Sequence, residues 1–213
     1  MTSQPRKRTA VLISGRGSNM TALIQAAMDP SFPAEIALVI SNKADAKGLE
    51  TARKAGIATR VISYRDHGSR EAHDAAIDAA LREAGIEIVA LAGYMRLLTP
   101  GFVRSWQGRM INIHPALLPL FKGLDTHNRA LDAGVRVHGC TVHFVTPDMD
   151  EGPIIAQAAV PVKTGDTEDT LAARVLEAEH ATYPEALAMV ARGDVRMAGN
   201  GRAIFRGQAN AAG

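Results

Sequence analysis

Asn112 and His114 are the residues whose types and spacing point most directly to chemistry. They stand two apart in residues 110–115, MINIHP. Alternate residues of a strand project to one face, so this pair points together while Ile111 and Ile113 face a core. An amide and an imidazole supply hydrogen-bond donors, and the imidazole can also transfer protons. The spacing predicts a site at a strand end; the alternative is two polar residues satisfied by nearby backbone groups.

His143 and Asp150 are two further polar residues that the same end of a sheet could gather. His143 lies in the strand-like run TVHFV, and Asp150 lies in the turn that follows it. If the strand of His143 lies next to that of Asn112 and His114, all four side chains would gather at one end of the sheet. We favour proton transfer over metal binding, because the residues lack compact metal-ligand spacing. For Asp150 the alternative is an ordinary turn carboxylate.

A glycine-rich segment, residues 15–20 (GRGSNM), follows the first predicted strand and opens a helix. N–H groups at a helix N-terminus lack partners and carry partial positive charge, and glycine allows close approach of a phosphate. Met20 replaces the third glycine of the dinucleotide fingerprint and no P-loop lysine follows, so neither NAD nor ATP is favoured. The segment is a candidate phosphate site; the alternative is a glycine turn with Ser18 or Asn19 as the helix cap.

Two further features of the sequence could contribute to a binding site, on weaker grounds. Glu179 falls four residues after Val175, on the apolar side of a predicted helix, where a carboxylate needs a partner. It could receive a ligand amine or hydroxyl, or reach water at the edge of the helix. Residues 93–98 (GYMRLL) follow an apolar strand and could line a pocket for an aromatic ring, or form an ordinary loop into the next helix.

The elements that must position these residues follow a regular rhythm in the first part of the chain. Short β-branched runs alternate with amphipathic stretches, which is typical of parallel strands covered by helices. Glycines stand where a left-handed residue can end a helix. The predicted strands are residues 9–14, 35–41, 59–62 and 87–92, and helices at 44–55, 69–84 and 126–133 end at Gly56, Gly85 and Gly134.

The pattern changes after residue 135. Residues 139–146 and 153–162 are strand-like, and the six residues between them are too few for a crossover helix, so the two strands should pair antiparallel. A helix is predicted from about 167 to 182, after which Pro184 should break or kink it before a last helical stretch to 191. The sequence predicts a three-layer, Rossmann-like α/β fold whose mostly parallel sheet gains antiparallel strands in the C-terminal half.

Length and composition favour one globular domain. The chain has 213 residues, 46% of them hydrophobic, and a formal net charge of +2 with no long basic run, so nucleic acid is not the favoured partner. A single cysteine, Cys140, excludes an internal disulfide and a thiolate-rich zinc site. No apolar run reaches the ~18 residues of a membrane span or forms a signal-peptide core. We expect a cytoplasmic protein without a membrane partner, in one domain over residues 1–213 with loosely ordered tails at about 1–8 and 198–213.

Taken together, the motifs closely resemble those of the phosphoribosylglycinamide formyltransferases, a branch of the folate-dependent formyltransferase family. The resemblance runs from about residue 9 to residue 197, with the motifs in family order and spacing. The wider family shares the Asn-x-His pair and the distal Asp, whereas the Gly-Ser-Asn loop and Glu179-His180 resemble the glycinamide ribonucleotide branch. The matching motifs are residues 15–19, 41–45, 91–96, 111–119, 143–145 and 150–153.

The resemblance implies the formyltransferase fold and a one-carbon transferase of purine (IMP) biosynthesis. It implies 10-formyltetrahydrofolate as the donor co-substrate, glycinamide ribonucleotide as the acceptor, and no metal. Both partners are small molecules, and the chain is expected to be a monomer or a homodimer. His114 would act as general acid towards the leaving folate nitrogen, and Asp150 would relay the proton of the attacking amine.

The resemblance also assigns roles to individual residues. The catalytic set would be Asn112, His114 and Asp150. Gly17, Ser18 and Asn19 would hold the ribonucleotide phosphate, and Leu176, Glu177, Ala178 and Glu179 would contact its ribose and glycinamide end. The folate site would comprise Arg70, Met95, Arg96, Leu97, Leu98, Asn112, His143, Thr146, Pro147, Asp148, Met149 and Asp150.

The chain departs from the family pattern at Asp125, which replaces a histidine of some members, and at Lys122, where others carry proline. These changes affect loop contacts rather than the chemistry. A formyltetrahydrofolate hydrolase is the nearest alternative, and the early start of the first strand argues against the regulatory domain that such enzymes carry. A methionyl-tRNA formyltransferase would need a further basic domain. A non-catalytic sensor of a phosphorylated ligand is the alternative from another class, and it would predict an incomplete catalytic set.

Overall fold

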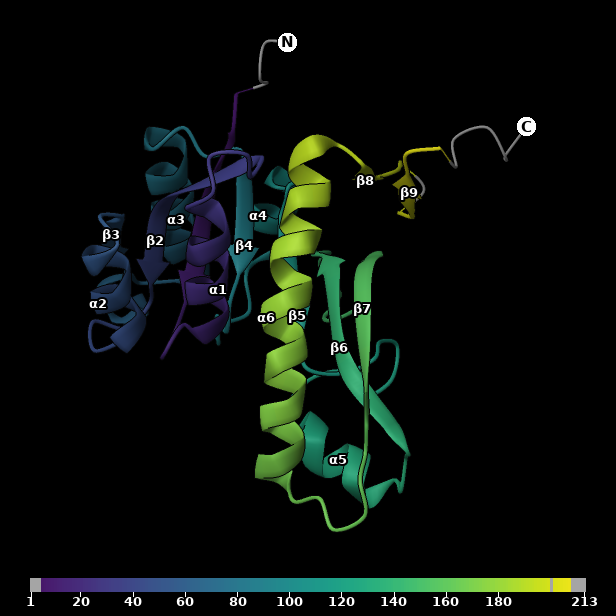
Figure 1. The fold of residues 1–213 in the computed structure, drawn as a ribbon. Coiled ribbons are helices and arrows are strands. Elements are labelled where there is room, and N and C mark those ends of the chain that lie inside the picture. The colour runs from purple at the N-terminus through teal and green to yellow at the C-terminus, as the bar shows by residue number, and fades with distance from the viewer. Residues whose placement is uncertain (1–4, 200, 208–213) are drawn as a thin grey trace.

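Seven strands form the central sheet, in the order β3-β2-β1-β4-β5-β6-β7 (Figure 1). The computed structural model describes residues 5–199 and 201–207 of the chain. The first five strands run parallel to one another, and β6 and β7 are each antiparallel to their neighbour. The strands are β1 (Lys7–Ile13), β2 (Ala34–Ser41), β3 (Ala58–Val61), β4 (Ile88–Leu91), β5 (Met110–His114), β6 (Val137–Phe144) and β7 (Ile154–Pro161).

Helices cover both faces of this sheet, with α1 and α6 in front of it in Figure 1 and α3 and α4 behind it. A short 3-10 helix precedes α3. The three-layer, mostly parallel α/β fold with antiparallel strands in its C-terminal half is therefore confirmed. The helices are α1 (Ser18–Ala27), α2 (Lys47–Lys54), η1 (Tyr64–Asp66), α3 (Arg70–Glu83), α4 (Pro100–Ser105), α5 (Thr126–Asp132) and α6 (Glu168–Arg192).

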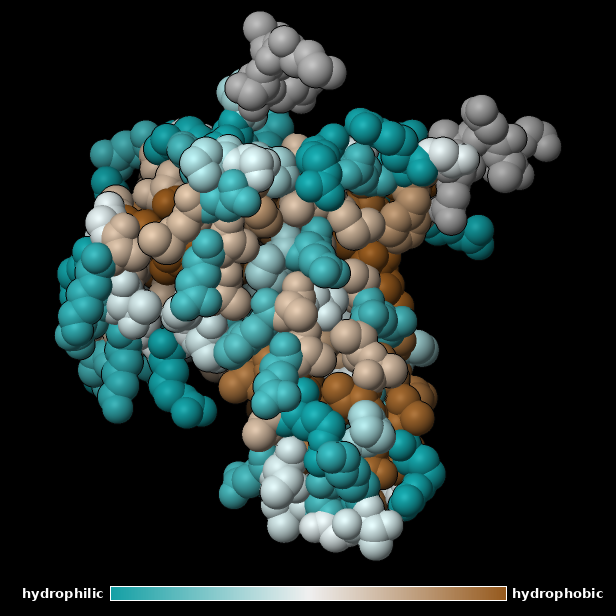
Figure 2. Space-filling view, viewed as in Figure 1, coloured by the Kyte–Doolittle hydropathy of each residue, from teal (hydrophilic) through white to brown (hydrophobic). Residues whose placement is uncertain are grey.

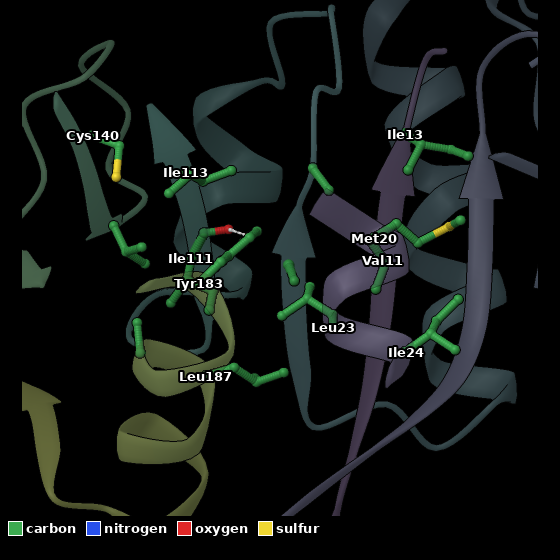
Figure 3. Packing of buried hydrophobic residues seen from close by; sticks show 14 of the residues in the cluster. Val11, Ile13, Met20, Leu23, Ile24, Ile111, Ile113, Cys140, Tyr183 and Leu187 are labelled. Atoms are coloured by element: carbon green, nitrogen blue, oxygen red, sulfur yellow. Dashed lines mark hydrogen bonds between the residues drawn. The ribbon is translucent and has the colours of Figure 1, made fainter. Parts of the chain in front are cut away.

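The alternation of side chains along the buried strands divides the core into two clusters. In β1, Val11 and Ile13 pack with α1 and α6, whereas Ala10 and Leu12 pack with α3 and α4. Figure 3 shows the first cluster, in which Met20 and Leu23 of α1 and Tyr183 of α6 pack in the same apolar layer as strand residues. Because both faces of the central strands are buried, their sequences are continuously apolar.

Helix α6 runs without interruption from Glu168 to Arg192, so Pro184 does not break the helix, which is one of the two effects predicted for it. Proline in a helix interior costs ~3 kcal/mol through a lost hydrogen bond and a steric clash. Tyr183 and Leu187, on either side of it, are fully buried. Burial of each such side chain stabilises the fold by about 1.5–3 kcal/mol, so burial of Tyr183 and Leu187 together offsets the cost of the proline.

The predicted loose tails extend too far into the chain. Lys7 and Arg8 already belong to β1, where their backbones pair with β2. Near the other end, β8 (Val195–Met197) and β9 (Ala203–Phe205) form a small antiparallel pair. These short strands lack the period-two pattern over several residues from which strands are predicted. Of the predicted tails, residues 1–4, 200 and 208–213 lie outside the described residues.

The surface is largely polar in the view of Figure 2, with hydrophobic residues showing mainly along the edge where β6 and β7 lie. Within residues 5–199 and 201–207, no helix combines the length and apolar character needed to cross a membrane.

Candidate active site

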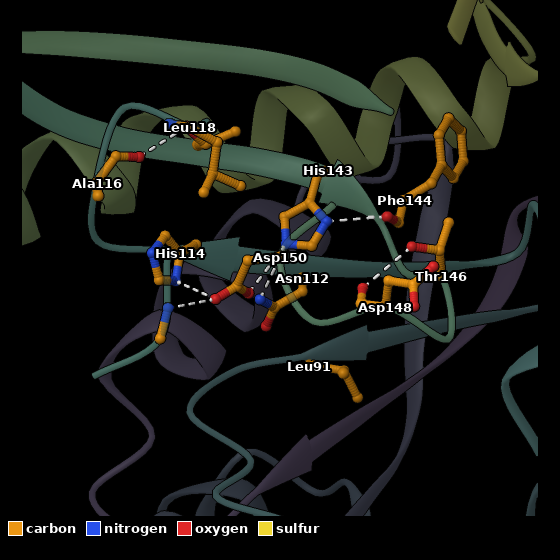
Figure 4. Close-up of polar contacts among 12 residues, drawn as sticks. Leu91, Asn112, His114, Ala116, Leu118, His143, Phe144, Thr146, Asp148 and Asp150 are labelled. Carbon is orange, nitrogen blue, oxygen red and sulfur yellow. Dashed lines mark hydrogen bonds and ion pairs between the residues drawn. The ribbon is translucent and has the colours of Figure 1, made fainter. Parts of the chain in front are cut away.

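The predicted site residues converge where β5 lies between the parallel and antiparallel parts of the sheet. In the antiparallel pairing of β5 with β6, Asn112 lies directly opposite His143. Directly opposed residues of neighbouring strands place their side chains on one face and within contact distance. Asp150 comes from the turn between β6 and β7 and reaches the same place (Figure 4).

Asn112 and His143 form an ordered polar pair. The Asn112 Nδ2 atom lies 3.2 Å from His143 Nε2, and His143 Nδ1 lies 2.9 Å from the Phe144 carbonyl oxygen. A carbonyl only accepts, so Nδ1 carries the proton and Nε2 accepts one N–H of the Asn112 amide. Burial lowers the pKa of His143 and keeps the ring neutral. The second N–H of Asn112 is left for a ligand oxygen.

His114 and Asp150 form the second pair. The His114 Nδ1 atom lies 3.5 Å from Asp150 Oδ2, and His114 Nε2 lies 3.0 Å from the Phe121 carbonyl oxygen. Both ring nitrogens thus face oxygen acceptors, so an imidazolium could donate at both ends. The side chains of His114 and Asp150 are only 6% and 10% exposed. Asp150 Oδ1 also lies 3.8 Å from His143 Nε2, so the two pairs adjoin.

The turn that carries Asp150 has a constrained backbone. Asp150 has a φ of 55°, in the left-handed region that aspartate tolerates better than most residues. The Gly123 N–H donates to Asp150 Oδ2 at 2.8 Å and fixes the direction of the carboxylate. A Cβ on Gly152 would lie only 1.6 Å from the Phe144 carbonyl oxygen, so the turn passes β6 where only glycine fits. Strained backbone of this kind is concentrated at functional sites.

The glycine-rich segment leads from β1 into α1, as predicted, but neither Ser18 nor Asn19 caps the helix. Gly17, at φ 71°, is the N-cap residue, and no described side chain accepts a hydrogen bond from the first turn. The Asn19 side chain instead points towards α6, where its amide donates to Glu179 Oε2 at 2.7 Å. The first turn therefore keeps free N–H groups for an anion.

A hollow of about 610 Å³ lies between α1 and α6, beside this first turn. Ser18 and His180 are among its lining residues, and the buried Nε2 of His180 has no hydrogen-bond partner within the described chain. The sequence patterns assign His180 no role of its own, although it adjoins Glu179. Its position one residue further along α6, facing the glycine-rich segment, can be recognised only once α1 and α6 are known to pack together.

Glu179 is the buried carboxylate of this second cluster, with 6% of its surface exposed. Burial raises the pKa of Glu179, and the hydrogen bond from Asn19 partly opposes that shift. Of the other predicted acceptor-binding residues on α6, Leu176 is half-buried, Glu177 is exposed and Ala178 packs against the core. The structure therefore brings Glu179 and Asn19 together, while Glu177 faces solvent.

Most of the predicted folate residues lie on two loops, after β4 and after β6, while Arg70 begins α3 and Asn112 and His143 lie in β5 and β6. Met95, Leu97 and Met149 are large apolar side chains left 63%, 65% and 56% exposed. Leu98 packs against the core beside α3 and α4. Exposed apolar side chains beside a polar cluster are typical of a surface that receives an aromatic ligand.

The polar members of the folate set have defined contacts. Arg70 donates from Nη2 to the Leu97 carbonyl oxygen at 3.2 Å, and the Arg96 guanidinium lies 3.7 Å from the centre of the Tyr64 ring. Thr146 donates to the Asp148 carbonyl oxygen at 3.2 Å. Pro147 and Asp148 are exposed at the tip of the turn.

A second hollow, of about 630 Å³, has Asp150 on its wall. Its other walls come from the loop after β5, the β6–β7 turn and β9, including Leu118, Pro119 and Phe205. It shares only Asp150 with the predicted folate residues.

No group of three or more His, Cys, Asp or Glu side chains with the arrangement of a metal site occurs in the part of the chain that the structure describes. The close residues His114, His143 and Asp150 are instead linked to one another and to backbone groups. These contacts suit proton exchange and hydrogen bonding to a developing negative charge.

Comparison with known proteins agrees with this geometry. The family model for formyl transferases matches residues 7–187. The chain is 58% identical over 200 residues to the trifunctional purine biosynthetic protein adenosine-3 of Bos taurus, covering 93% of this chain but only 20% of that protein. It is 48% identical over 187 residues to phosphoribosylglycinamide formyltransferase of Escherichia coli, covering 88% of each chain.

A solved structure gives the same result. The phosphoribosylglycinamide formyltransferase of Brucella melitensis is 60% identical, with a TM-score of 0.85 over 87% of this chain and 96% of that one. The resemblance predicted from the motifs is confirmed by these matches. The chain belongs to the formyl transferase family.

Proposed function

We propose that this chain transfers a formyl group from 10-formyltetrahydrofolate to the amine of N1-(5-phospho-D-ribosyl)glycinamide. The products are formylglycinamide ribonucleotide and tetrahydrofolate, in a step of purine biosynthesis. The observation that carries the proposal is the convergence of Asn112, His114 and Asp150, with His114 Nδ1 and Asp150 Oδ2 3.5 Å apart. The names of the similar proteins support the same substrates.

The acceptor would bind between α1 and α6. Its phosphate would meet the free N–H groups that Gly17, Ser18 and Asn19 present at the start of α1. Glu179, buried and bonded to Asn19, would accept hydrogen bonds from a ribose hydroxyl or the glycinamide end. Leu176 and its neighbours Glu177 and Ala178 would complete this wall. His180 lines the same hollow, beside Ser18.

The donor would bind on the other side of Asn112. The exposed apolar side chains Met95, Leu97 and Met149 would cover its ring system. Arg70 and Arg96 would lie at the rim, where cations suit the carboxylates of a folate. Residues 146–150 would line the opposite side of the folate.

The reaction needs stabilisation of the negative charge that develops on the formyl oxygen, and a net transfer of one proton from the amine to the folate nitrogen. The neutral amine attacks the formyl carbon, a C–N bond forms, and the carbonyl electrons move to oxygen. The free N–H of Asn112 and a protonated His114 would donate to that oxygen, and loss of one such donor typically costs ~10²–10³ in rate. No metal is part of this proposal.

Collapse of the tetrahedral centre completes the transfer. Asp150, directly or through water from the adjoining hollow, would take the proton of the attacking ammonium. His114 would give a proton to the folate nitrogen as its bond to carbon breaks. Asp150 would then return a proton to His114 across their 3.5 Å contact. The net result is that the formyl group passes from the folate to the amine and one proton passes from the amine to the folate nitrogen.

Release of tetrahydrofolate from 10-formyltetrahydrofolate, with and without the acceptor, tests the proposal. Release that depends on the acceptor would support the formyltransferase. Release that ignores the acceptor would favour a formyltetrahydrofolate hydrolase, and no release in either case would favour a non-catalytic sensor. His114→Ala and Asp150→Asn turning over within a few-fold of the parent would contradict the assigned roles. A cytoplasmic location and a monomer or homodimer remain predictions.

A further inference from the structure

Residues 93–99 form the loop between β4 and α4 that carries the predicted folate contacts Met95, Arg96 and Leu97. At its start the loop is tied to the end of β1. The Ser14 N–H donates to the Gly93 carbonyl oxygen at 3.1 Å, and the Met95 N–H donates to Ser14 Oγ at 2.8 Å. These bonds fix the first half of the loop, and the second half needs other anchors.

Thr99, at the end of the second half, caps α4, and three further anchors come from η1 and α3. The Tyr64 ring lies under the Arg96 guanidinium, Arg70 donates to the Leu97 carbonyl oxygen, and Asp74 Oδ2 accepts the Thr99 N–H at 2.6 Å. We call Tyr64, Arg70 and Asp74 the α3 brace. Each member holds a different position of the loop, so together they determine its path from Arg96 to the start of α4.

Asp74 is the most deeply placed member, with 5% of its surface exposed. Its other oxygen lies 3.5 Å from His73 Nδ1, while His73 Nε2 bonds to the Ile62 carbonyl oxygen at 3.0 Å. A buried carboxylate is a strong acceptor, so its hydrogen bond holds the Thr99 N–H firmly.

The brace determines which side chains of the loop are held in place and which are exposed. Arg96 turns towards Tyr64, and Thr99 is buried next to Asp74, whereas Met95 and Leu97 remain largely exposed. Arg96 and Thr99 are thus held in place by η1 and α3, while Met95 and Leu97 are left exposed for a ligand. A loop held in its binding form loses less entropy when the ligand binds.

We propose that Tyr64 and Asp74 are positioning residues that hold loop 93–99 in its folate-binding form without themselves touching folate. The inference rests on the proposed function, because it assumes that this loop receives the formyl donor. Loss of a brace contact should weaken binding of the donor and leave the chemistry and the acceptor site unchanged.

The first test uses a matched pair at Tyr64, which is half-buried, so its replacement should not prevent folding. Tyr64→Leu removes the ring beneath Arg96, and Tyr64→Phe retains it. A cation–π contact at an exposed site is worth about a two- to fivefold change in binding. Tyr64→Leu should raise the KM for 10-formyltetrahydrofolate by about that factor, with kcat and the acceptor KM unchanged. Tyr64→Phe should match the parent.

The second test uses Asp74 and a readout that does not depend on activity. Asp74→Ala removes the acceptor of the Thr99 N–H, whereas Asp74→Asn keeps an oxygen there. Amide hydrogen exchange at Thr99 should be faster by at least about tenfold in the alanine variant, since an opening bond exposes the amide. Asp74→Asn should restore much of the protection of the Thr99 amide and should bring the KM for 10-formyltetrahydrofolate back towards the parental value.

The outcomes separate this inference from the proposed function. A parent protein that transfers no formyl group would refute the function, while the exchange of Thr99 would still report on the brace. If the parent is active and Tyr64→Leu has the donor KM of Tyr64→Phe, the positioning role of Tyr64 is refuted. A fall in kcat with a rise in both KM values would indicate a general structural defect and would also overturn the inference.

Discussion

Asn112 is oriented by a neutral histidine rather than by a charged group. His143 accepts one of its amide hydrogens and is itself fixed by the Phe144 carbonyl oxygen. Asn112→Ala should lower kcat by about 10²–10³ with little change in either KM, because the lost donor acts on charge that develops during the reaction. Steady-state kinetics of the purified variant measure this. Asn128→Ala, on the exposed side of α5, should keep parental kcat; a parental kcat for Asn112→Ala would remove Asn112 from the catalytic set.

Two buried tyrosines near the site should respond to the loss of their hydroxyl in opposite ways. The Tyr94 hydroxyl is buried with no partner among the described residues, and an unpaired buried polar group costs about 1–3 kcal/mol. The Tyr183 hydroxyl donates to the Leu91 carbonyl oxygen at 2.9 Å. Tyr94→Phe should therefore raise the Tm and Tyr183→Phe should lower it. Thermal unfolding of both variants checks this, and equal shifts would contradict it.

The residues that sequence alone could place are those governed by the two-residue period of a strand. That period put Asn112 and His114 on one face, and the neighbouring strand run placed His143 beside them. The period could not predict that Phe121 and Gly123 would supply the backbone partners of His114 and Asp150. Those contacts arise from loop backbone, including left-handed φ values at Phe121 and Asp150, for which glycine would have been the expected residue.

At the scale of elements, α1 and α6 are joined through Asn19 and the buried Glu179. Burial raises the pKa of Glu179 above its ordinary value of 4.5, so the folded protein binds this proton more tightly than the unfolded chain does. That contribution to stability is complete below pH 4.5 and is lost as the pH rises through the raised pKa. Glu179→Gln should thus gain stability relative to the parent as the pH rises.

Chemical unfolding at several pH values measures this difference. The advantage of Glu179→Gln should be smallest at acid pH and largest near neutrality. A difference independent of pH would show that Glu179 titrates as in the unfolded chain. The same variant should raise the acceptor KM if Glu179 binds the ribonucleotide, so stability and function would change in opposite directions at this position.

The turn between β6 and β7 depends on Gly152. A Cβ there would meet the Phe144 carbonyl oxygen at 1.6 Å, and the turn also carries Asp150. Gly152→Ala should lower the Tm and reduce kcat, because the turn must shift to relieve the overlap. A Cβ on Gly101 in α4 would meet no neighbouring atom within 4 Å, and Gly101 has no left-handed φ. Gly101→Ala is the matched control and should leave kcat unchanged; parental kcat and Tm for Gly152→Ala would contradict the account.

Most elements could be predicted from local patterns, and the exceptions have physical reasons. Gly56, Gly85 and Gly134 do adopt left-handed φ values after α2, α3 and α5. The continuity of α6 through Pro184 could not be predicted, since it depends on tertiary burial of Tyr183 and Leu187. The alternative in which Ser18 or Asn19 caps α1 does not hold, and the Asn19 side chain bonds instead to Glu179, a residue 160 positions away.

For the whole molecule, strand order decides where the site lies. The chain builds β1, β2 and β3 outward on one side and then returns to place β4 and β5 on the other side of β1. Loops at such a reversal point leave in opposite directions and open a crevice at the carboxyl ends of the strands. The rhythm of strands and helices predicts a mixed sheet, but strand order depends on long-range pairing that no local pattern reports.

The mixed sheet also explains why three segments of different origin meet. The glycine-rich segment and loop 93–99 follow parallel strands, whereas Asp150 arrives on an antiparallel turn. An acceptor bound at α1 and a donor bound at loop 93–99 would therefore meet at Asn112 and His114, beside Asp150. We propose that the two substrates react directly with each other at this point.

The most direct test follows the formyl carbon itself. Protein is mixed with 10-formyltetrahydrofolate carrying a ¹³C-labelled formyl group, together with the glycinamide ribonucleotide, and the products are identified by NMR and mass spectrometry. We expect the label on the acceptor amine, with one tetrahydrofolate formed for each labelled product and no transfer by His114→Ala above a small residual rate. Label recovered as free formate, at a rate independent of the acceptor, would contradict the account.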